Sequence, residues 1–509
     1  MRPLALLPRV LSAGLLALPL LRAAPAERSF AIVAYNVENL HDLDGVAMYE
    51  DYQPAQYTAA HLAVKAANIA KVLARVDKGA GPALVAFNEI ELDQTPESSV
   101  TNLDAWLASV AGRTLPELLG QNPLPAELAG LPAEAWLLKA CADAGLTGYH
   151  VATTNERPRK HEDGHSQAIR NLLFSKFPIK DVRTHPTPNA RAILEVTVDA
   201  EGSPLTLFVN HWKSGAGDPQ TEVSRRANAT TLRTRLDELL ATDPNADFIV
   251  AGDLNSHYNQ KQRYRAMGTT AINDVLGSQG NELNLRGKDR DLYNLWFELP
   301  SDQRGSDIYK EEWGTLMHLI VSRGLYDQNG VQYADNSFAV LKLSGLNANA
   351  LGLPNRWARG AVPAGFSDHF PVYARFRVIG PGPKDKWMPL TRASETPEGP
   401  GTPVRVETST VDLFATALKP ADLPTGADLR DGSYTGRIFL IDAPANVNEK
   451  GHVSVKVGGL DYDVFSHNKE LRNTYRERAR TSSRLRFYGE LGQYKGTWQF
   501  VLQGKEWLR

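Results

Sequence analysis

The sequence predicts a layered α/β sandwich followed by a small β-barrel. Apolar, strand-like runs alternate irregularly with helical segments up to residue 378, a Pro/Gly-rich stretch follows, and short alternating strands fill the remainder of the chain. A strict strand–helix alternation would instead indicate a doubly wound parallel sheet. The 509 residues are 42% hydrophobic, which is enough for a large core.

The elements of the first unit follow from apolar periodicity. A helix is expected over 57–76, because apolar residues such as Leu62, Ala66, Ile69 and Leu73 recur at spacings of four and three. A long polar helix is expected over 222–240, and a mostly helical stretch with Pro breaks over 103–142. Strands are expected at 30–37, 83–90, 169–174, 192–198, 204–210, 248–251, 316–322 and 371–378.

The N-terminus is typical of a secretory signal peptide. Arg2 and Arg9 precede the apolar run 10–21, and Ala24-Pro25-Ala26 gives a small-x-small cleavage pattern. We therefore expect residues 1–26 to be removed and the protein to be secreted or periplasmic in a bacterium. The run is too short for a spanning helix, so no stable membrane association is expected after processing. The single cysteine, Cys141, leaves no internal disulfide.

Composition divides the remainder into three parts. The predicted sandwich covers 28–378, and a Pro/Gly-rich linker with GPGP and ETPEGPGTP covers 379–403. Residues 404–509 alternate like five strands with one helix between them, which favours an OB-like barrel. The net charge of −2 gives no overall attraction to nucleic acid, so any such binding requires local basic patches.

Five short segments place metal- or phosphate-seeking side chains at the ends of apolar runs. They read AYNVEN, VAFNEIE, VNHWKS, VAGDLNSH and FSDHFPV. Strand ends that meet at one edge of a core are where hydrolytic metal sites are commonly built. The candidate residues are Asn36, Glu38, Glu89, His211, Lys213, Asp253, Asn255, Asp368 and His369.

Each residue type suits a particular part of phosphate-ester chemistry. A divalent cation can offset the cost of burying a strand-end carboxylate such as Glu89. Mg²⁺ binds one or two protein carboxylates together with waters and phosphate oxygens. Asp253 and Asn255 are separated by one residue, so on an extended segment their side chains face the same way. Together they could orient an attacking water molecule. His211 suits donation to a phosphoryl oxygen. Taken singly, each segment is explained equally well as a turn or a satisfied strand residue.

The ordered series resembles the endonuclease/exonuclease/phosphatase superfamily, the DNase-I-like fold, over about residues 28–378. The resemblance implies a four-layer α/β sandwich that hydrolyses phosphoric esters with Mg²⁺ or Mn²⁺, with Ca²⁺ as an alternative. It implies that Glu89, Asn36, Glu38 and Asp368 form the metal site, and that His211, Asp253, Asn255 and His369 are catalytic. Lys213, Arg170 and Asn171 are expected to contact the substrate phosphate.

The chain departs from the family pattern in one place. The family places an acid where Met317 stands in TLMHLIVS, and that acid normally orients the imidazole matched by His369. No replacement is evident in the sequence, and His318 is expected to point to the opposite face. Loss of such a supporting acid costs orders of magnitude in triad-like systems. The expectation is a slowed enzyme or a rearranged pair.

Three functions are consistent with these residues. The first is a secreted nuclease for DNA or RNA, supported by Arg-rich sequence with interleaved aromatics over 469–498. The second is a phosphatase or phospholipase C-type enzyme acting on lipid or inositol phosphates. The third is a binding protein weakened by Met317. The same basic stretch is also explained by a solvated helix over an aromatic core. Oligomeric state and strand preference are left open.

Overall fold

The computed structural model describes residues 28–390 and 417–509, apart from 97–99, 101, 161–165, 288–289, 310–311, 350–351, 360–362, 431–433, 467, 495 and 503–504. The predicted signal peptide, and residues 391–403 of the predicted linker, lie outside the described residues.

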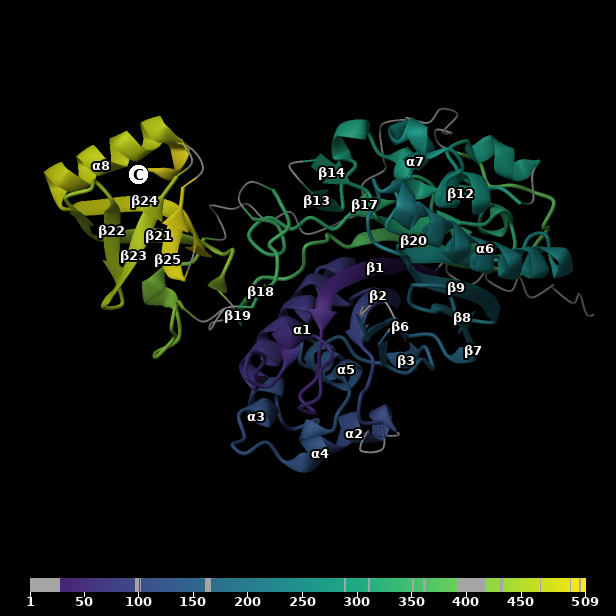
Figure 1. Ribbon diagram of the computed structural model, residues 1–509, viewed down its shortest axis with the longest axis horizontal. Coiled ribbons are helices and arrows are strands. Elements are labelled where there is room, and N and C mark those ends of the chain that lie inside the picture. The colour runs from purple at the N-terminus through teal and green to yellow at the C-terminus, as the bar shows by residue number, and fades with distance from the viewer. Residues whose placement is uncertain are drawn as a thin grey trace, which may run out of the picture.

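Two seven-stranded sheets form the centre of the first unit (Figure 1). The first has the order β16-β20-β1-β2-β6-β3, with β17 paired to β20. Its strands are β1 (Arg28–Leu40), β2 (Leu84–Glu91), β3 (His150–Thr153), β6 (Ile169–Ser175), β16 (Gly330–Tyr333), β17 (Ala339–Val340) and β20 (Val372–Gly380). The second has the order β11-β12-β15-β10-β9-β8-β7. Its strands are β7 (Ile179–His185), β8 (Ile193–Ala200), β9 (Ser203–His211), β10 (Phe248–Asp253), β11 (Ser278–Gln279), β12 (Leu292–Asn294) and β15 (Met317–Val321).

Side-chain alternation along the strands produces the layers. In β1, Ile32 and Ala34 enter the core between the two sheets, whereas Val33 and Tyr35 face the helices. Helices α1 (Ala59–Leu73) and α5 (Ala133–Asp143) cover that outer face, with α2 (Leu103–Ser109), α3 (Leu115–Leu119) and α4 (Ala126–Ala129) beside them. Helix α6 (Pro219–Thr242) covers the outer face of the second sheet. The arrangement is helix, sheet, sheet, helix, and it confirms the predicted four-layer sandwich.

Helix α6 is tied to β8 by one buried carboxylate. Glu195 accepts hydrogen bonds from Arg235 at 2.8 and 2.9 Å and lies 2.6 Å from the His185 Nε2. Burial opposes ionisation, but these partners outweigh it and lower the pKa of Glu195 to about 2. Because the folded pKa is below the ordinary 4.5, the stabilisation is present above that value and is lost as the pH falls toward 2.

We therefore expect Glu195→Gln to lower the free energy of unfolding by about 2 kcal/mol at neutral pH and by less near pH 3. Urea unfolding at both pH values checks this, with exposed Glu127→Gln as the control. A loss of equal size at both pH values would contradict the assignment.

The C-terminal unit is a closed barrel of five strands in the order β21-β22-β23-β25-β24, drawn in yellow in Figure 1. The strands are β21 (Ile438–Val447), β22 (Val453–Val457), β23 (Leu460–Phe465), β24 (Arg484–Tyr494) and β25 (Thr497–Val501), with α8 (Lys469–Ser482) between β23 and β24. The predicted small barrel is confirmed. Tyr475, Phe487 and Trp498 lie in its core, so these rings are not stacking platforms. No described helix has the length and apolar character that crossing a bilayer requires.

The sandwich continues past residue 379, where the linker was predicted to begin. Strand β20 runs to Gly380, Met388 is buried, and its backbone N–H donates to the Tyr326 carbonyl at 2.9 Å. Trp387 pairs with Asp327 in an antiparallel bridge. Pro and Gly in 379–390 gave a linker-like composition, but the apolar Trp387 and Met388 dock this stretch on the core.

Candidate active site

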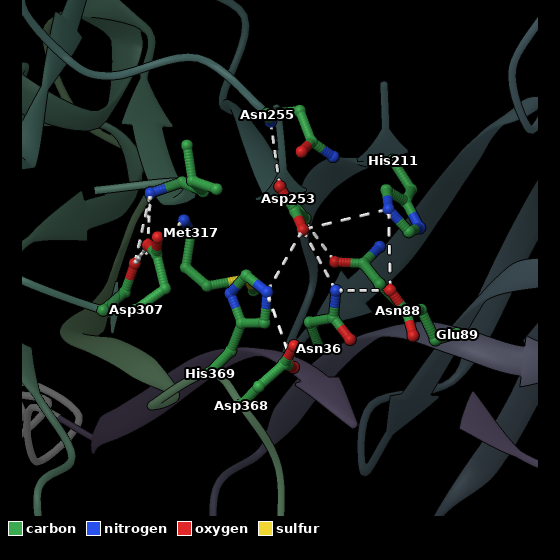
Figure 2. Close-up of polar contacts among 12 residues, drawn as sticks. Asn36, Asn88, Glu89, His211, Asp253, Asn255, Asp307, Met317, Asp368 and His369 are labelled. Carbon is green, nitrogen blue, oxygen red and sulfur yellow. Dashed lines mark hydrogen bonds and ion pairs between the residues drawn. The ribbon is translucent and has the colours of Figure 1, made fainter. Parts of the chain in front are cut away.

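The five predicted segments meet at the ends of the central strands. In β1 and β2, Asn36 lies opposite Asn88 in a parallel ladder. In the second sheet, Asp253 of β10 lies between His211 of β9 and Met317 of β15. Figure 2 shows these side chains and His369, which precedes β20, directed into one space. The two sheets therefore bring together residues that are far apart in the chain.

Three residues at the strand ends of this site adopt the left-handed backbone conformation. Glu38, Glu89 and Asn255 have φ values of 54°, 66° and 45°. The β1–β2 register is irregular after Asn36, and the β2–β6 register is irregular after Phe87. Such conformations are costly for residues other than glycine and cluster at functional sites. The bulge releases Glu89 from the ladder and turns its carboxylate toward the other site residues.

A hydrogen-bonded centre joins the two sheets. The Asn36 amide donates to Glu89 Oε1 at 2.9 Å and to Asp253 Oδ2 at 3.0 Å. His211 Nε2 lies 3.8 Å from each of these same two oxygens. Asp253 Oδ1 accepts the backbone N–H of Asn255 at 2.8 Å. All of these groups are held in place before any substrate binds, as electrostatic catalysis requires.

The two imidazoles have opposite environments. Burial, Arg191 and His369 hold the pKa of His211 well below its usual value, so His211 is neutral. Burial also acts to lower the pKa of His369, but nearby carboxylates outweigh it, led by Asp368 and Asp253, and raise that pKa to about 9. His369 Nε2 lies 3.7 Å from Asp368 Oδ1 and 3.8 Å from Asp253 Oδ2. His369 is therefore a cation near neutral pH.

Asp307 supplies an acid on the other side of His369. Strand β13 (Asp307–Tyr309) forms a hairpin with β14 (Glu312–Gly314), and Asp307 bridges His369 in antiparallel pairing. Directly opposed residues of such a pair carry their side chains on the same face. Asp307 Oδ1 accepts from Ser306 Oγ at 2.8 Å and from Leu316 N at 3.1 Å, which fixes the carboxylate. Figure 2 shows the His369 ring between Asp307 and the pair Asp253 and Asp368.

Met317 is buried at the predicted position facing the site, opposite Asp253, and supplies no charge there. As expected, His318 is directed elsewhere, with its Nε2 2.8 Å from the Ser256 carbonyl and its Nδ1 3.1 Å from Asn294. Asp307 of the neighbouring hairpin brings a negative charge close enough to raise the pKa of His369. No hydrogen bond joins the two side chains, since His369 Nδ1 has no partner among the described residues.

The donor set fits a divalent cation. Burial and the like charge of Asp368 raise the pKa of Glu89 to about 7, which shows the cost of holding this carboxylate without a cation. The Glu38 carboxylate accepts from Trp357 N at 2.8 Å, and Arg356 lies 3.3 Å from Asp368. Glu89, Glu38 and Asp368 carry the hard carboxylate oxygens that Mg²⁺, Mn²⁺ and Ca²⁺ take, while the Asn36 amide oxygen accepts the N–H of Glu38 at 3.0 Å.

Two of the three predicted substrate-binding residues are placed differently. Arg170 pairs with Glu134 at 2.6 Å and is only 7% exposed. Asn171 is fully buried and donates to the carbonyls of Ala192 and Val209. The expectation that these two contact the phosphate was therefore wrong, because both are used inside the fold. Lys213 is half-buried, and its backbone carbonyl accepts from Arg225 at 3.1 Å, so it anchors a loop beside His211.

Two site residues were missed by the sequence reasoning. Asn88 accepts the N–H of Asp253 at 2.8 Å and donates to Asn171 and to the Asn210 carbonyl, so it ties the two sheets together beneath the site. Arg191 acts on Glu89 and His211, lowering the pKa of both. Asn88 precedes Glu89 in the segment already chosen, which was a usable signal. Arg191 lies in the loop just before β8 and belongs to no motif.

Comparison with known proteins agrees with this geometry. Residues 169–377 match the model of the Endonuclease/Exonuclease/phosphatase family. This part of the chain is therefore similar to the endonuclease/exonuclease/phosphatase family, in agreement with the resemblance of the five segments. By class it is a phosphoric ester hydrolase. No curated protein matches the chain significantly.

Solved structures similar to this chain include truncated Caenorhabditis elegans TDP2, with 12% identity, a TM-score of 0.36, and coverage of 68% of this chain and 97% of that one. A family protein from Bacteroides thetaiotaomicron has 12% identity, a TM-score of 0.37, and coverage of 69% and 98%. D. rerio TDP2 complexed with single strand DNA product has 13% identity, a TM-score of 0.36, and coverage of 68% and 98%.

Proposed function

We propose that this chain is a divalent-metal-dependent phosphodiesterase that cleaves nucleic acid outside the cytoplasm. The observation that carries the proposal is the Asn36–Glu89–Asp253 centre with a neutral His211 and a cationic His369 beside it. Groups whose environments push their pKa values apart are typical of acid–base sites. The export part of the proposal is supported by the apolar N-terminal run and its small-x-small end.

The chain's own residues suit in-line attack by water. Asp253, held by Asn36 and Asn255, is placed to orient the water and accept its proton. His369 is placed to donate to a phosphoryl oxygen as charge develops there, and the negative charge of Asp307 favours its protonated ring. His211 offers a neutral N–H donor. A cation held by Glu89, Asn36, Glu38 and Asp368 would supply positive charge to the developing oxyanions.

A polyanionic substrate is supported by the basic surface of the barrel. Arg478, Arg480, Arg484 and Arg486 are exposed on α8 and β24, and Tyr494 is 63% exposed. Exposed Arg side chains attract a phosphate backbone, and an exposed aromatic ring suits base stacking.

The lipid-phosphate alternative has less support. In the described part of the chain, the exposed large apolar side chains lie singly on separate elements, such as Val182 on β7, Val223 on α6 and Leu460 on β23. Scattered apolar residues are ordinary for a protein surface, whereas membrane binding needs a contiguous patch. The binding-protein alternative rests on the missing acid at Met317, and the negative charge of Asp307 near His369 weighs against it.

Turnover of four substrates tests the proposal. Purified protein is incubated with plasmid DNA, RNA, a phosphomonoester and phospholipid vesicles, each with Mg²⁺ and with EDTA. We expect nicked or degraded nucleic acid with Mg²⁺ alone. Hydrolysis confined to the phosphomonoester or the vesicles would overturn the nuclease assignment, and binding of DNA without turnover would support the binding protein.

Arg191 provides a test of substrate binding. Its charge is the strongest opposing influence on Glu89, and it lies beside His211. We expect Arg191→Ala to raise the KM for DNA on the order of 10-fold with a smaller effect on kcat, because a phosphate contact is lost. Arg183→Ala, on exposed β7, is the control. An unchanged KM would remove Arg191 from the substrate site.

A further inference from the structure

A second carboxylate group lies apart from the active site. Glu282 in η5 (Glu282–Arg286), Glu298 in η6 (Leu295–Glu298) and Asp335 after β16 each bring an oxygen within 4.8 Å of the others. It shares no residue with the active site. Glu282 and Glu298 are 2% and 1% exposed. Burying three ionised acids together is unfavourable in free energy unless a positive charge or hydrogen-bond donors stabilise them.

Tyrosine hydroxyls donate to two of these three acids. Tyr326 donates to Glu282 Oε1 at 2.9 Å, and Tyr333 donates to Glu298 Oε2 at 2.6 Å. The second oxygen of Glu298, Oε1, is buried without a hydrogen-bond partner among the described residues. Both amide atoms of Asn336, the next residue after Asp335, are likewise buried without partners. A buried carboxylate oxygen without a donor is a rare feature that calls for an unseen ligand.

A cation would offset the repulsion within this group. After burial, the strongest charge acting on Glu298 is Glu282, and Asp335 adds to it, so both neighbours raise the pKa of Glu298. Two oxygens bound to one Ca²⁺ lie no more than about 5 Å apart, which accommodates the observed spacing.

We propose that Glu282, Glu298 and Asp335 bind a structural Ca²⁺ ion separate from the catalytic metal. Three buried carboxylates without a substrate nearby suit Ca²⁺, because Ca²⁺ takes more protein oxygens, in a more flexible geometry, than Mg²⁺. Glu282 and Glu298 flank β12 of the second sheet, and Asp335 follows β16 of the first sheet. The ion therefore joins the two sheets at a point where no backbone ladder links them, and stabilises the sandwich.

Thermal unfolding of the full chain tests this proposal. After EDTA treatment and removal of the chelator, CaCl₂ is expected to raise the Tm by about 5 °C at 100 times its dissociation constant. Glu89→Gln is expected to retain this shift, since Glu89 belongs to the catalytic site. Glu298→Gln and Asp335→Asn are expected to lose it, and exposed Glu127→Gln is expected to keep it.

The ion is counted by mass spectrometry of desalted protein, so the result does not depend on activity. We expect one tightly bound Ca²⁺ in Glu89→Gln and none in the double variant Glu89→Gln/Glu298→Gln. Asp335→Asn, at a partly exposed position, replaces Glu298→Gln if that variant does not fold. A shift lost in Glu89→Gln but kept in Glu298→Gln, or no shift at all, would overturn the proposal. Equal stabilisation by MgCl₂ would overturn the assignment to Ca²⁺.

Discussion

Glu89→Gln is expected to lower kcat for DNA hydrolysis on the order of 10³-fold, because the substitution removes the charge that holds the catalytic cation. The amide keeps the size of the side chain, and Asn36 retains an oxygen to which it can donate. Burial raises the pKa of Glu89, so the free protein is expected to gain stability when this charge is removed. Initial rates at saturating Mg²⁺ and Mn²⁺ titration calorimetry measure the two effects.

Glu91→Gln is the matched control for this prediction. Glu91 lies on the same strand and is also buried, but its carboxylate accepts the N–H of Asp42 and pairs with His41. We expect it to alter stability and leave Mn²⁺ affinity at the catalytic site unchanged. A Glu89→Gln protein with wild-type kcat and wild-type Mn²⁺ affinity would show that the metal lies elsewhere.

Asp307→Asn is expected to lower kcat on the order of 10²-fold, because His369 loses the acid that substitutes for the one missing at Met317. KM is expected to change little, since Asp307 does not contact the substrate. The alkaline limb of the pH–rate profile is expected to move to lower pH, because the charge of Asp307 raises the pKa of His369. A purely structural role would not move this limb.

A second substitution separates orientation from folding. Placing Met317→Asp in the Asp307→Asn background restores an acid at the usual family position, opposite Asp253. We expect partial recovery of kcat, because either carboxylate can support His369. Asp302→Asn, at an exposed position in the short helix that precedes β13, is the control. Full activity in Asp307→Asn alone would remove this residue from the mechanism.

The sequence predicted most of the site because its signals were local. Apolar runs ending in NVEN, NEIE, NHW, GDLN and SDH place their polar residues where strands end, and the sheets then bring those ends together. The alternation of side chains along a strand also predicted that the His318 side chain would point away from the site. The four-layer order came from the family resemblance, since strand pairing between distant segments leaves no period in a single sequence.

Asp307 could not be found in this way. Its function depends on the short β13–β14 hairpin lying against the residues before β20, and on Asp307 rather than a neighbour meeting His369. No local pattern encodes that register. The predictions for Arg170 and Asn171 were wrong for a different reason. Both residue types suit phosphate binding, but Arg170 pairs with buried Glu134 and Asn171 donates to a backbone carbonyl.

Anomalous diffraction from crystals of the full chain grown with Mn²⁺ tests the central claim most directly. We expect a strong peak within coordination distance of a Glu89 carboxylate oxygen, on the side facing His211 and His369. A peak confined to Glu282, Glu298 and Asp335, with Glu89 bonded only to Asn36, would contradict a metal-dependent active site at these strand ends.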